Sequence, residues 1–155
     1  MIDGYKVEDL FIEAAPKEWL FLRKANANED MNEHWDVKFL IDGIETLIDV
    51  KAHKAEYRNG PLLKDWFWVE FVNVRGNTGW VHGKADYIAF EYNDEFLVYN
   101  RVGIAATCLM IVDLDTVVDK ASKACNVGYR RFGRKDLISK IKISDLAKPK
   151  YIISK

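Results

Sequence analysis

The sequence predicts an α/β (α+β) fold in which strands dominate and helices cover the faces of a mixed central sheet. Three observations predict this class. The chain has 155 residues, enough to bury a sizeable core. Hydrophobic residues make up 49% and aromatic residues 13%, which excludes a disordered chain. An Asp-Gly pair at 42–43 separates two β-rich runs. We therefore expect a single domain over residues 1–155.

The first half of the chain predicts one helix and a hairpin. Apolar residues recur at helical spacing over residues 5–15, and Pro16 ends the pattern, so an amphipathic helix is expected there. The remaining elements are a short strand over 19–24, a polar loop over 26–33, and a hairpin of two strands over 35–41 and 44–51.

The second half predicts further strands and a later helix. Residues 66–74 are rich in aromatic and β-branched side chains and indicate a strand, which a turn-rich connection over 76–83 follows. The other expected elements are a second hairpin of 85–92 and 95–101 around Asn93-Asp94, a strand over 109–112, a helix over 114–124 capped by Asp113 or Asp115, and a closing edge strand over 141–143.

The net charge of −1 conceals an uneven distribution. Residues 1–119 contain 12 basic and 22 acidic side chains, a net −10, whereas residues 120–155 contain 11 and 2, a net +9. Such a division favours a protein that holds cations at one place and phosphates at another. A folded surface that mixes both signs explains the same numbers.

The sequence points to a reducing compartment. Cys108 and Cys125 are too few for a disulfide framework and form no metal-binding Cys pair. No apolar run has the length of a membrane helix, and residues 1–4 lack the pattern of a secretory signal. We therefore expect a cytoplasmic protein without a membrane partner.

The predicted hairpin brings two carboxylates together. With a two-residue turn, Asp36 lies directly opposite Asp49, and His34 lies opposite Lys51. Two facing carboxylates repel each other unless a divalent cation lies between them, and oxygen ligands of this kind suit Mg²⁺ or Mn²⁺. The alternative is a solvated polar face in which lysines, including Lys38, neutralise the aspartates.

Two other acidic residues are candidates for the same site. Glu8 lies at the edge of the apolar face of the first helix, and Glu70 shares a strand face with Trp66 and Trp68. A carboxylate on such a face is costly unless it is paired or bound to metal. Alternatively, Glu8 is an ordinary surface residue, and Glu70 lies on an edge strand whose face is only half covered.

A basic run near the C-terminus is a candidate nucleic-acid contact. Residues 129–135 interleave aromatic and basic side chains, an arrangement that suits a phosphate backbone. The expected DNA-binding residues are Arg130, Arg131, Arg134 and Lys135. A solvated basic surface is the alternative.

These residues together resemble the PD-(D/E)XK nuclease superfamily, in particular its small phage-type and Holliday-junction-resolvase-like endonucleases. The resemblance covers roughly residues 5–90 and consists of a helix with a glutamate, then Asp36, then Asp49-Val50-Lys51 thirteen residues later. The stretches 70–80 and 83–87 look like small phage relatives. The usual proline before the first aspartate is Trp35 here, and residues 52–65 are too few for the full helix that the family places there.

The resemblance implies a restriction-endonuclease-like core and a set of residue roles. Asp36 and Asp49 would hold one or two Mg²⁺ or Mn²⁺ ions with the Val50 carbonyl, and Lys51 would activate the attacking water and stabilise the phosphorus centre. Glu8 would support the metal or the water. Glu70 and His34 would support these residues without binding the metal themselves, and His34 would lie beside the site.

The function that follows is metal-dependent hydrolysis of DNA phosphodiester bonds, an endodeoxyribonuclease activity that leaves a 5′-phosphate. Small members of the superfamily often act as dimers, so a homodimer is possible, and a phage-encoded protein of this kind would work in the host cytoplasm. One alternative is a catalytically inactive nucleic-acid-binding or interaction module with the same fold. Another is cleavage of RNA at the same site.

Overall fold

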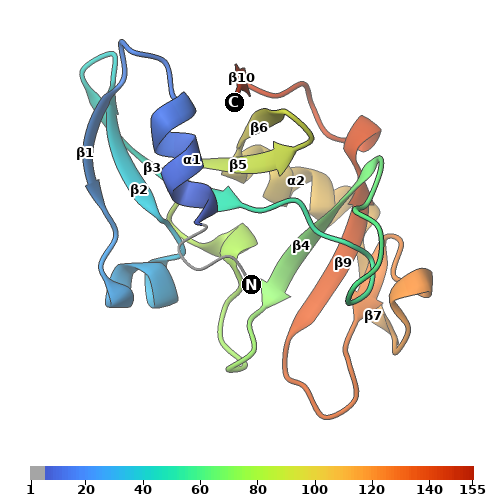
Figure 1. Ribbon diagram of the computed structural model, residues 1–155. Helices are drawn as coiled ribbons and strands as arrows, with labels where there is room; N and C mark the ends of the chain where they lie inside the picture. Colours follow the sequence, from blue (N-terminus) through green and yellow to red (C-terminus); the bar gives the residue numbers. More distant parts are fainter. Residues whose placement is uncertain (1–5) are drawn as a thin grey trace. The chain divides into compact units, whose positions relative to one another are not determined.

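The computed structural model describes residues 6–155 as an α+β protein with two mixed β-sheets (Figure 1). The chain forms two compact units. The first contains residues 1–53, 84–101 and 148–155, and the second contains 54–83 and 102–147. Because the chain passes four times between the units, neither is a continuous segment, and the single domain over residues 1–155 stays a prediction.

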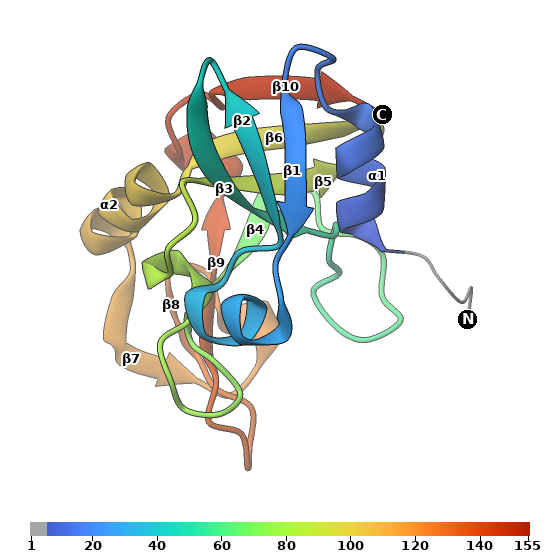
Figure 2. The same ribbon diagram turned by 90° about the vertical axis from the view of Figure 1, so that its left-hand side faces the viewer.

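The first unit is built on a six-stranded sheet with the order β1-β2-β3-β5-β6-β10. The strands β1 (Leu20–Lys24), β2 (Val37–Ile41) and β3 (Ile44–Lys51) form an antiparallel meander, visible at the front of Figure 2. Next to β3 lies β5 (Tyr87–Tyr92), which runs parallel to it, and the sheet continues with β6 (Glu95–Asn100) and β10 (Tyr151–Ser154). The predicted hairpins at 42–43 and 93–94 are both confirmed.

The core of the first unit lies between this sheet and helix α1 (Val7–Ala14). The helix is close to its predicted extent; position 5 of the prediction lies outside the described residues. Phe11 of α1 is completely buried and packs edge-to-face against Phe39 and Phe96. Burying one such ring contributes about 1.5–3 kcal/mol. Alternation along β2 places Val37, Phe39 and Ile41 in this core and leaves the opposite face for polar side chains.

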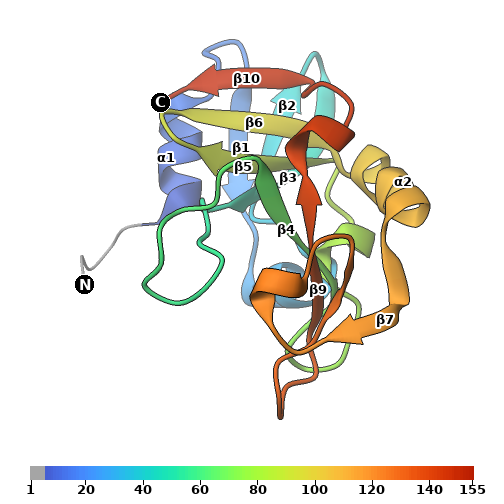
Figure 3. The same ribbon diagram turned by 90° about the vertical axis from the view of Figure 1, so that its right-hand side faces the viewer.

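The second unit contains a four-stranded sheet with the order β4-β9-β8-β7, of which β4, β9 and β7 are labelled in Figure 3. The edge strand β4 (Trp66–Val72) buries Phe67, Val69 and Phe71 and pairs with β9 (Leu137–Lys142). Beyond β9 lie β8 (Val127–Tyr129) and β7 (Asp113–Val118), which run parallel to each other. The predicted closing edge strand at 141–143 is therefore wrong in position, because its residues 141 and 142 belong to the interior strand β9.

The later helix also differs from the prediction. It is α2 (Arg101–Ile111), which includes most of the expected strand at 109–112, whereas the expected helix at 114–124 is replaced by β7 and a 3₁₀ turn, η3 (Ala121–Lys123). Asp113 does not cap a helix: its carboxylate accepts hydrogen bonds from the Asp115 amide and the Thr116 hydroxyl, at 3.0 and 2.7 Å. This local turn competes with helix formation. No helix among residues 6–155 is long and apolar enough to cross a membrane.

Candidate active site

The β2–β3 hairpin positions the two aspartates in the first unit. Both residues of its turn, at 42–43, have positive φ, as a two-residue hairpin turn requires. The pairing of Val37 with Ile48 confirms the predicted register. One step outward, Asp36 donates its amide N–H to the Ile48 carbonyl at 2.9 Å, so the Asp36 side chain lies beside that of Asp49.

The carboxyl groups of Asp36 and Asp49 are hydrogen-bonded to each other. Asp49 is only 3% exposed and Asp36 is half-buried. Burial, followed by the charge of Asp49, raises the pKa of Asp36 to about 7. Burial also raises the pKa of Asp49, although Lys51 and the hydrogen bond with Asp36 act against it. The Asp36 carboxyl therefore keeps its proton to a much higher pH than an ordinary aspartate, because two carboxyls side by side in a buried place do not both ionise easily.

The end of β3 supplies two further contacts to this pair. The Val50 amide donates a hydrogen bond of 2.7 Å to Oδ2 of Asp36, and Nζ of Lys51 lies 3.1 Å from Oδ2 of Asp49. That Asp49 oxygen is buried and accepts no well-aligned hydrogen bond from the described residues, so Lys51 stabilises it mainly through charge. A buried oxygen that is only partly satisfied marks a place for a cation or a water molecule.

Asp30 is a third carboxylate at the site, and the sequence reasoning missed it. It lies in a single π-helical turn, η1 (Glu29–Glu33), and its carboxyl is hydrogen-bonded to that of Asp36. Burial and then the charge of Asp36 raise the pKa of Asp30, while Lys51 and His34 lower it. The sequence signal was an acidic segment six residues before Asp36, without a periodicity that showed which carboxylate lies next to Asp36; Asp30 itself is exposed.

The neighbours of Asp30 explain why it is the one that faces Asp36. Glu29 is held by a bidentate ion pair with Arg23, at 2.6 and 2.8 Å, and by the amide of Asn26. Glu33 accepts a hydrogen bond of 3.0 Å from the indole nitrogen of Trp35. Both glutamates of the turn are therefore engaged with residues other than the aspartate pair.

Glu8 is placed less directly. Its helix α1 packs on the apolar face of the sheet, opposite to the face that carries the aspartate pair. Glu8 is half-buried. The pKa of Lys24 is raised mainly by its hydrogen bond with Asp9 and to a smaller extent by the charge of Glu8. Lys24 ends β1 and pairs with Val37. Glu8 thus stands at the same end of the sheet as Asp36, but it is not among the main groups that shift the Asp36 pKa. Its metal or water role stays a prediction.

The two supporting positions have different surroundings. His34 follows η1 with a left-handed φ of 60°, is half-buried, and acts electrostatically on Asp30, so it belongs to the neighbourhood of the pair. Glu70 belongs to the second unit, where it is half-buried on the edge strand β4 opposite Ile138. Because this strand face is only half covered, the Glu70 carboxylate is stable there without a metal or an ion pair. Its supporting role stays a prediction.

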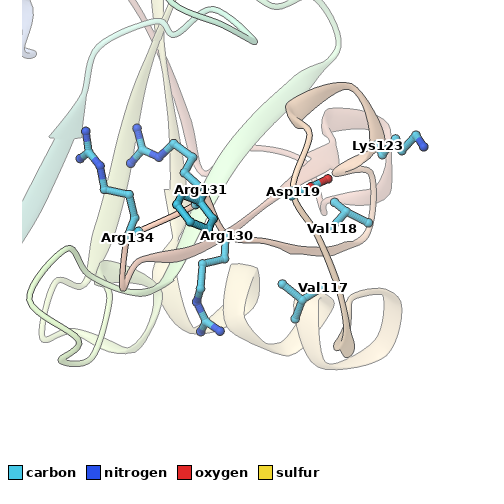
Figure 4. A pocket seen from close by; sticks show the side chains of 9 residues that line it. Val117, Val118, Asp119, Lys123, Arg130, Arg131 and Arg134 are labelled. Carbon is cyan, nitrogen blue, oxygen red and sulfur yellow. The ribbon is translucent and has the colours of Figure 1, made fainter.

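The predicted DNA-binding residues lie together in the second unit, on the loop that joins β8 to β9. Arg130, Arg131, Arg134 and Lys135 are all exposed. Arg131 forms an ion pair with the buried Asp136, and Figure 4 shows how the arginines extend from the loop. The structure thus brings the four basic residues together on one exposed loop. Their contact with DNA stays a prediction.

The aspartate pair has the donor chemistry that Mg²⁺ or Mn²⁺ prefers. Its buried carboxylate oxygens are hard ligands, and a divalent cation would favour the ionised form of both groups. Within residues 6–155, no three His, Cys, Asp or Glu side chains already converge on one metal position. A cation held by one or two carboxylates would complete its shell with water and substrate phosphate oxygens, as Mg²⁺ commonly does.

Comparison of the chain with protein-family models, with curated proteins and with solved structures gives no match. The geometry of the described residues is thus what indicates the chemistry of the site. That geometry joins a buried carboxyl pair, a third carboxyl and a lysine ammonium within one strand pair and the turn that precedes it. Such a group can hold a hard cation and contact an anionic oxygen with the same cluster.

Proposed function

We propose that this chain is a metal-dependent nuclease that hydrolyses DNA phosphodiester bonds. The observation that carries the proposal is the buried, mutually hydrogen-bonded pair Asp36 and Asp49, with Lys51 at 3.1 Å from the second carboxyl. Two facing carboxyls and a buried charge cost stability, and perturbed groups of this kind cluster at functional sites.

The topology of the first unit supports a restriction-endonuclease-like core. Helix α1 precedes an antiparallel meander, and a strand parallel to β3 follows, in the order β1-β2-β3-β5. The motif residues lie on β3 and directly before β2. The family's helix between these parallel strands is missing here, since residues 54–83 contribute β4 and its loops to the second unit instead.

In this proposal the chain's own residues position the reactants. Asp36, Asp49 and the Val50 carbonyl hold Mg²⁺ or Mn²⁺, which supplies Lewis-acid stabilisation and a more acidic water when bound. Lys51 orients the water and places positive charge beside the phosphorus centre as it gains negative charge. Water forms the new bond to phosphorus and the bond to the 3′-oxygen breaks, so the product carries a 5′-phosphate. Asp30 adds a third oxygen donor next to Asp36.

A cleavage panel tests the assignment. Linear duplex, single-stranded DNA, circular plasmid and a four-way junction are each incubated with Mg²⁺, with Mn²⁺ and with EDTA. We expect cation-dependent cleavage of at least one form, reduced at least 1,000-fold by Asp49→Asn or Lys51→Ala while DNA binding persists, on the scale of losses at catalytic groups. The matched controls are Glu45→Gln and Lys38→Ala, which remove an ion pair of 3.5 Å between an exposed glutamate and a half-buried lysine of the same hairpin.

Two outcomes contradict the proposal. Cleavage that survives unchanged in the Asp49→Asn protein assigns the activity to another site or to a contaminant. Cleavage of RNA in preference to every DNA form moves the substrate to RNA, so an RNA of matched sequence is included in the panel.

A second candidate function is an inactive nucleic-acid-binding or interaction module. One observation favours it: the Lys51–Asp49 ion pair and the raised pKa of Asp36 reduce the negative charge of the carboxyl cluster without a cation. Thermal denaturation with and without Mn²⁺ separates the candidates. If the chain is a nuclease, Mn²⁺ at 100 times its dissociation constant raises the free energy of unfolding by about 2.7 kcal/mol. This stabilisation disappears in Asp49→Asn. An inactive module shows no cation-dependent shift in its unfolding temperature.

A further inference from the structure

The loop between β8 and β9 exposes an aromatic ring completely. Phe132 has a relative exposure of 102%, the largest of the large hydrophobic residues in the described part of the chain. The backbone holds the ring at the tip of a tight turn, in which the Arg134 amide donates to the Arg131 carbonyl at 3.0 Å and Gly133 adopts a φ of 74°. A large apolar ring fixed in water at a turn tip is a candidate contact residue.

Beside this ring lies a shallow pocket of about 620 Å³, wholly within the second unit. Val117 and Val118 of β7 give it an apolar part, and Lys123 together with arginines of the loop gives it a cationic part. In Figure 4, the side chains of Arg131 and Arg134 extend to one side of the loop and that of Arg130 extends to the other. In the sequence, Phe132 stands between Arg131 and Arg134, so the loop carries guanidinium groups on either side of the ring.

The cationic character of the pocket is only partly neutralised. Asp136 is 3% exposed and pairs with Arg131, which keeps this guanidinium in place while 44% of its side chain remains exposed. Among the described residues, Arg130, Arg134 and Lys123 have no ion pair, and Asp119 is the one carboxylate that lines the pocket. An anionic partner thus finds one fixed guanidinium and several adaptable cations.

We propose that this loop and pocket bind DNA in which bases are unpaired, with Phe132 stacked on a base and Arg130, Arg131 and Arg134 on the flanking phosphates. Guanidinium groups bind phosphate in a bidentate manner, and aromatic side chains stack on the faces of exposed bases. In a continuous duplex the base faces are already covered by their neighbours, so a fully exposed ring has no face to meet. The proposal rests on the DNA partner of the proposed function but not on cleavage.

The charge pattern favours a nucleic acid over other anionic partners. An anionic membrane surface attracts lysine and arginine alike and needs several inserted apolar side chains or a lipid anchor for stable binding, whereas this tip presents a single ring. An acidic peptide offers carboxylates but no flat faces for the ring. Alternating phosphates and flat bases match alternating guanidiniums and an aromatic ring.

Binding assays in EDTA test the proposal without any cleavage. The intact protein is titrated into a fluorescein-labelled 20-nucleotide oligothymidylate and into a duplex of the same length. We expect Phe132→Ala to weaken single-strand binding about tenfold and duplex binding less than twofold, as the loss of one stacked base predicts. Tyr57→Ala, which removes another exposed ring of the second unit (60%), is the matched control and leaves both affinities unchanged.

Three outcomes of these binding assays would overturn the proposal, and one would support it without the nuclease. Equal affinities of Phe132→Ala and the original chain for the single strand overturn it, as does equal loss on single strand and duplex. Stronger Phe132-dependent binding of oligouridylate, or of vesicles of phosphatidylglycerol and phosphatidylcholine, assigns the loop to RNA or to a membrane and also overturns it. Phe132-dependent binding of the oligothymidylate without cleavage of any DNA supports the loop's role while contradicting the nuclease.

Discussion

The aspartate pair shows how a single register decides the chemistry of this hairpin. One residue of slip would turn one strand over relative to the other, so one aspartate would enter the apolar core and the pair would be lost. The positive φ values at 42–43 fix the register, so the sequence brings Asp36 to Asp49 through its turn rather than through any attraction between the two. The raised pKa of Asp36 is the electrostatic consequence of that enforced contact.

Asp36→Asn is expected to stabilise the cation-free protein at alkaline pH. The pKa of Asp36 is about 7 in the folded protein against an ordinary 3.8, so the folded chain keeps a proton that the unfolded chain releases. The free energy of unfolding therefore falls as pH rises from about 4 to about 7 and levels off above that. At 1.4 kcal/mol per pKa unit, the variant gains on the order of 2–4 kcal/mol at pH 8 and nothing at pH 4.

Urea denaturation in EDTA at pH 4, 6 and 8 measures this gain. Asp42→Asn is the control, because it makes the same carboxyl-to-amide change at an exposed position of the same hairpin, where asparagine tolerates the φ of 50°. A stability difference between the Asp36→Asn protein and the original chain that is independent of pH would contradict the assignment.

Asp30→Asn is expected to weaken the binding of Mn²⁺ about tenfold. The Asp30 carboxyl is hydrogen-bonded to that of Asp36, so it contributes charge and a third oxygen donor beside the proposed cation position. Calorimetric titration with Mn²⁺ at pH 8 measures the affinity independently of activity, with Asp42→Asn again as the control. An unchanged affinity would leave Asp30 outside the cation site.

At the scale of elements, strong local signals were predictable and context-dependent ones were not. The Asp-Gly and Asn-Asp turns require positive φ, which few residue pairs supply, and both hairpins were predicted from them. Helix α2 has a sequence that is apolar on nearly all sides, although only Ile104 and Cys108 are buried, so no helical periodicity marked it. The π turn that places the exposed Asp30 next to Asp36 likewise has no periodic signal.

Gly79→Ala is expected to destabilise the second unit by about 2–3 kcal/mol. The Gly79 amide donates to the Phe71 carbonyl at 2.9 Å, and a Cβ at this position would lie 2.4 Å from the Glu70 carbonyl oxygen, which belongs to a paired strand and cannot move aside cheaply. Gly43→Ala meets no atom within 4 Å and costs only about 1–2 kcal/mol for its positive φ. Urea denaturation of both variants should give this order, and the reverse order would contradict the role of close packing at Gly79.

At the scale of the whole molecule, the charge asymmetry of the sequence becomes an asymmetry of the two units. The first unit contains 11 basic and 16 acidic residues, a net −5, and the second contains 12 and 8, a net +4. The acidic excess is thus on the unit with the aspartate pair and the basic excess on the unit with the Phe132 loop. Each unit combines segments from both parts of the sequence, so the difference in net charge between the units is smaller than that between residues 1–119 and 120–155.

This distribution predicts that the affinity for DNA falls steeply as the salt concentration rises, and that the basic residues of the second unit alone cause this dependence. Each phosphate neutralised on single-stranded DNA contributes about −0.7 to the slope of log K against log salt concentration. We expect Arg130→Ala and Arg134→Ala each to reduce the magnitude of the oligothymidylate slope by about 0.7, whereas Lys64→Ala, an exposed cation elsewhere in the same unit, leaves it unchanged. Titrations in EDTA between 50 and 300 mM salt measure the slopes. Identical slopes for all three variants and the original chain would mean that the phosphates lie on a different surface.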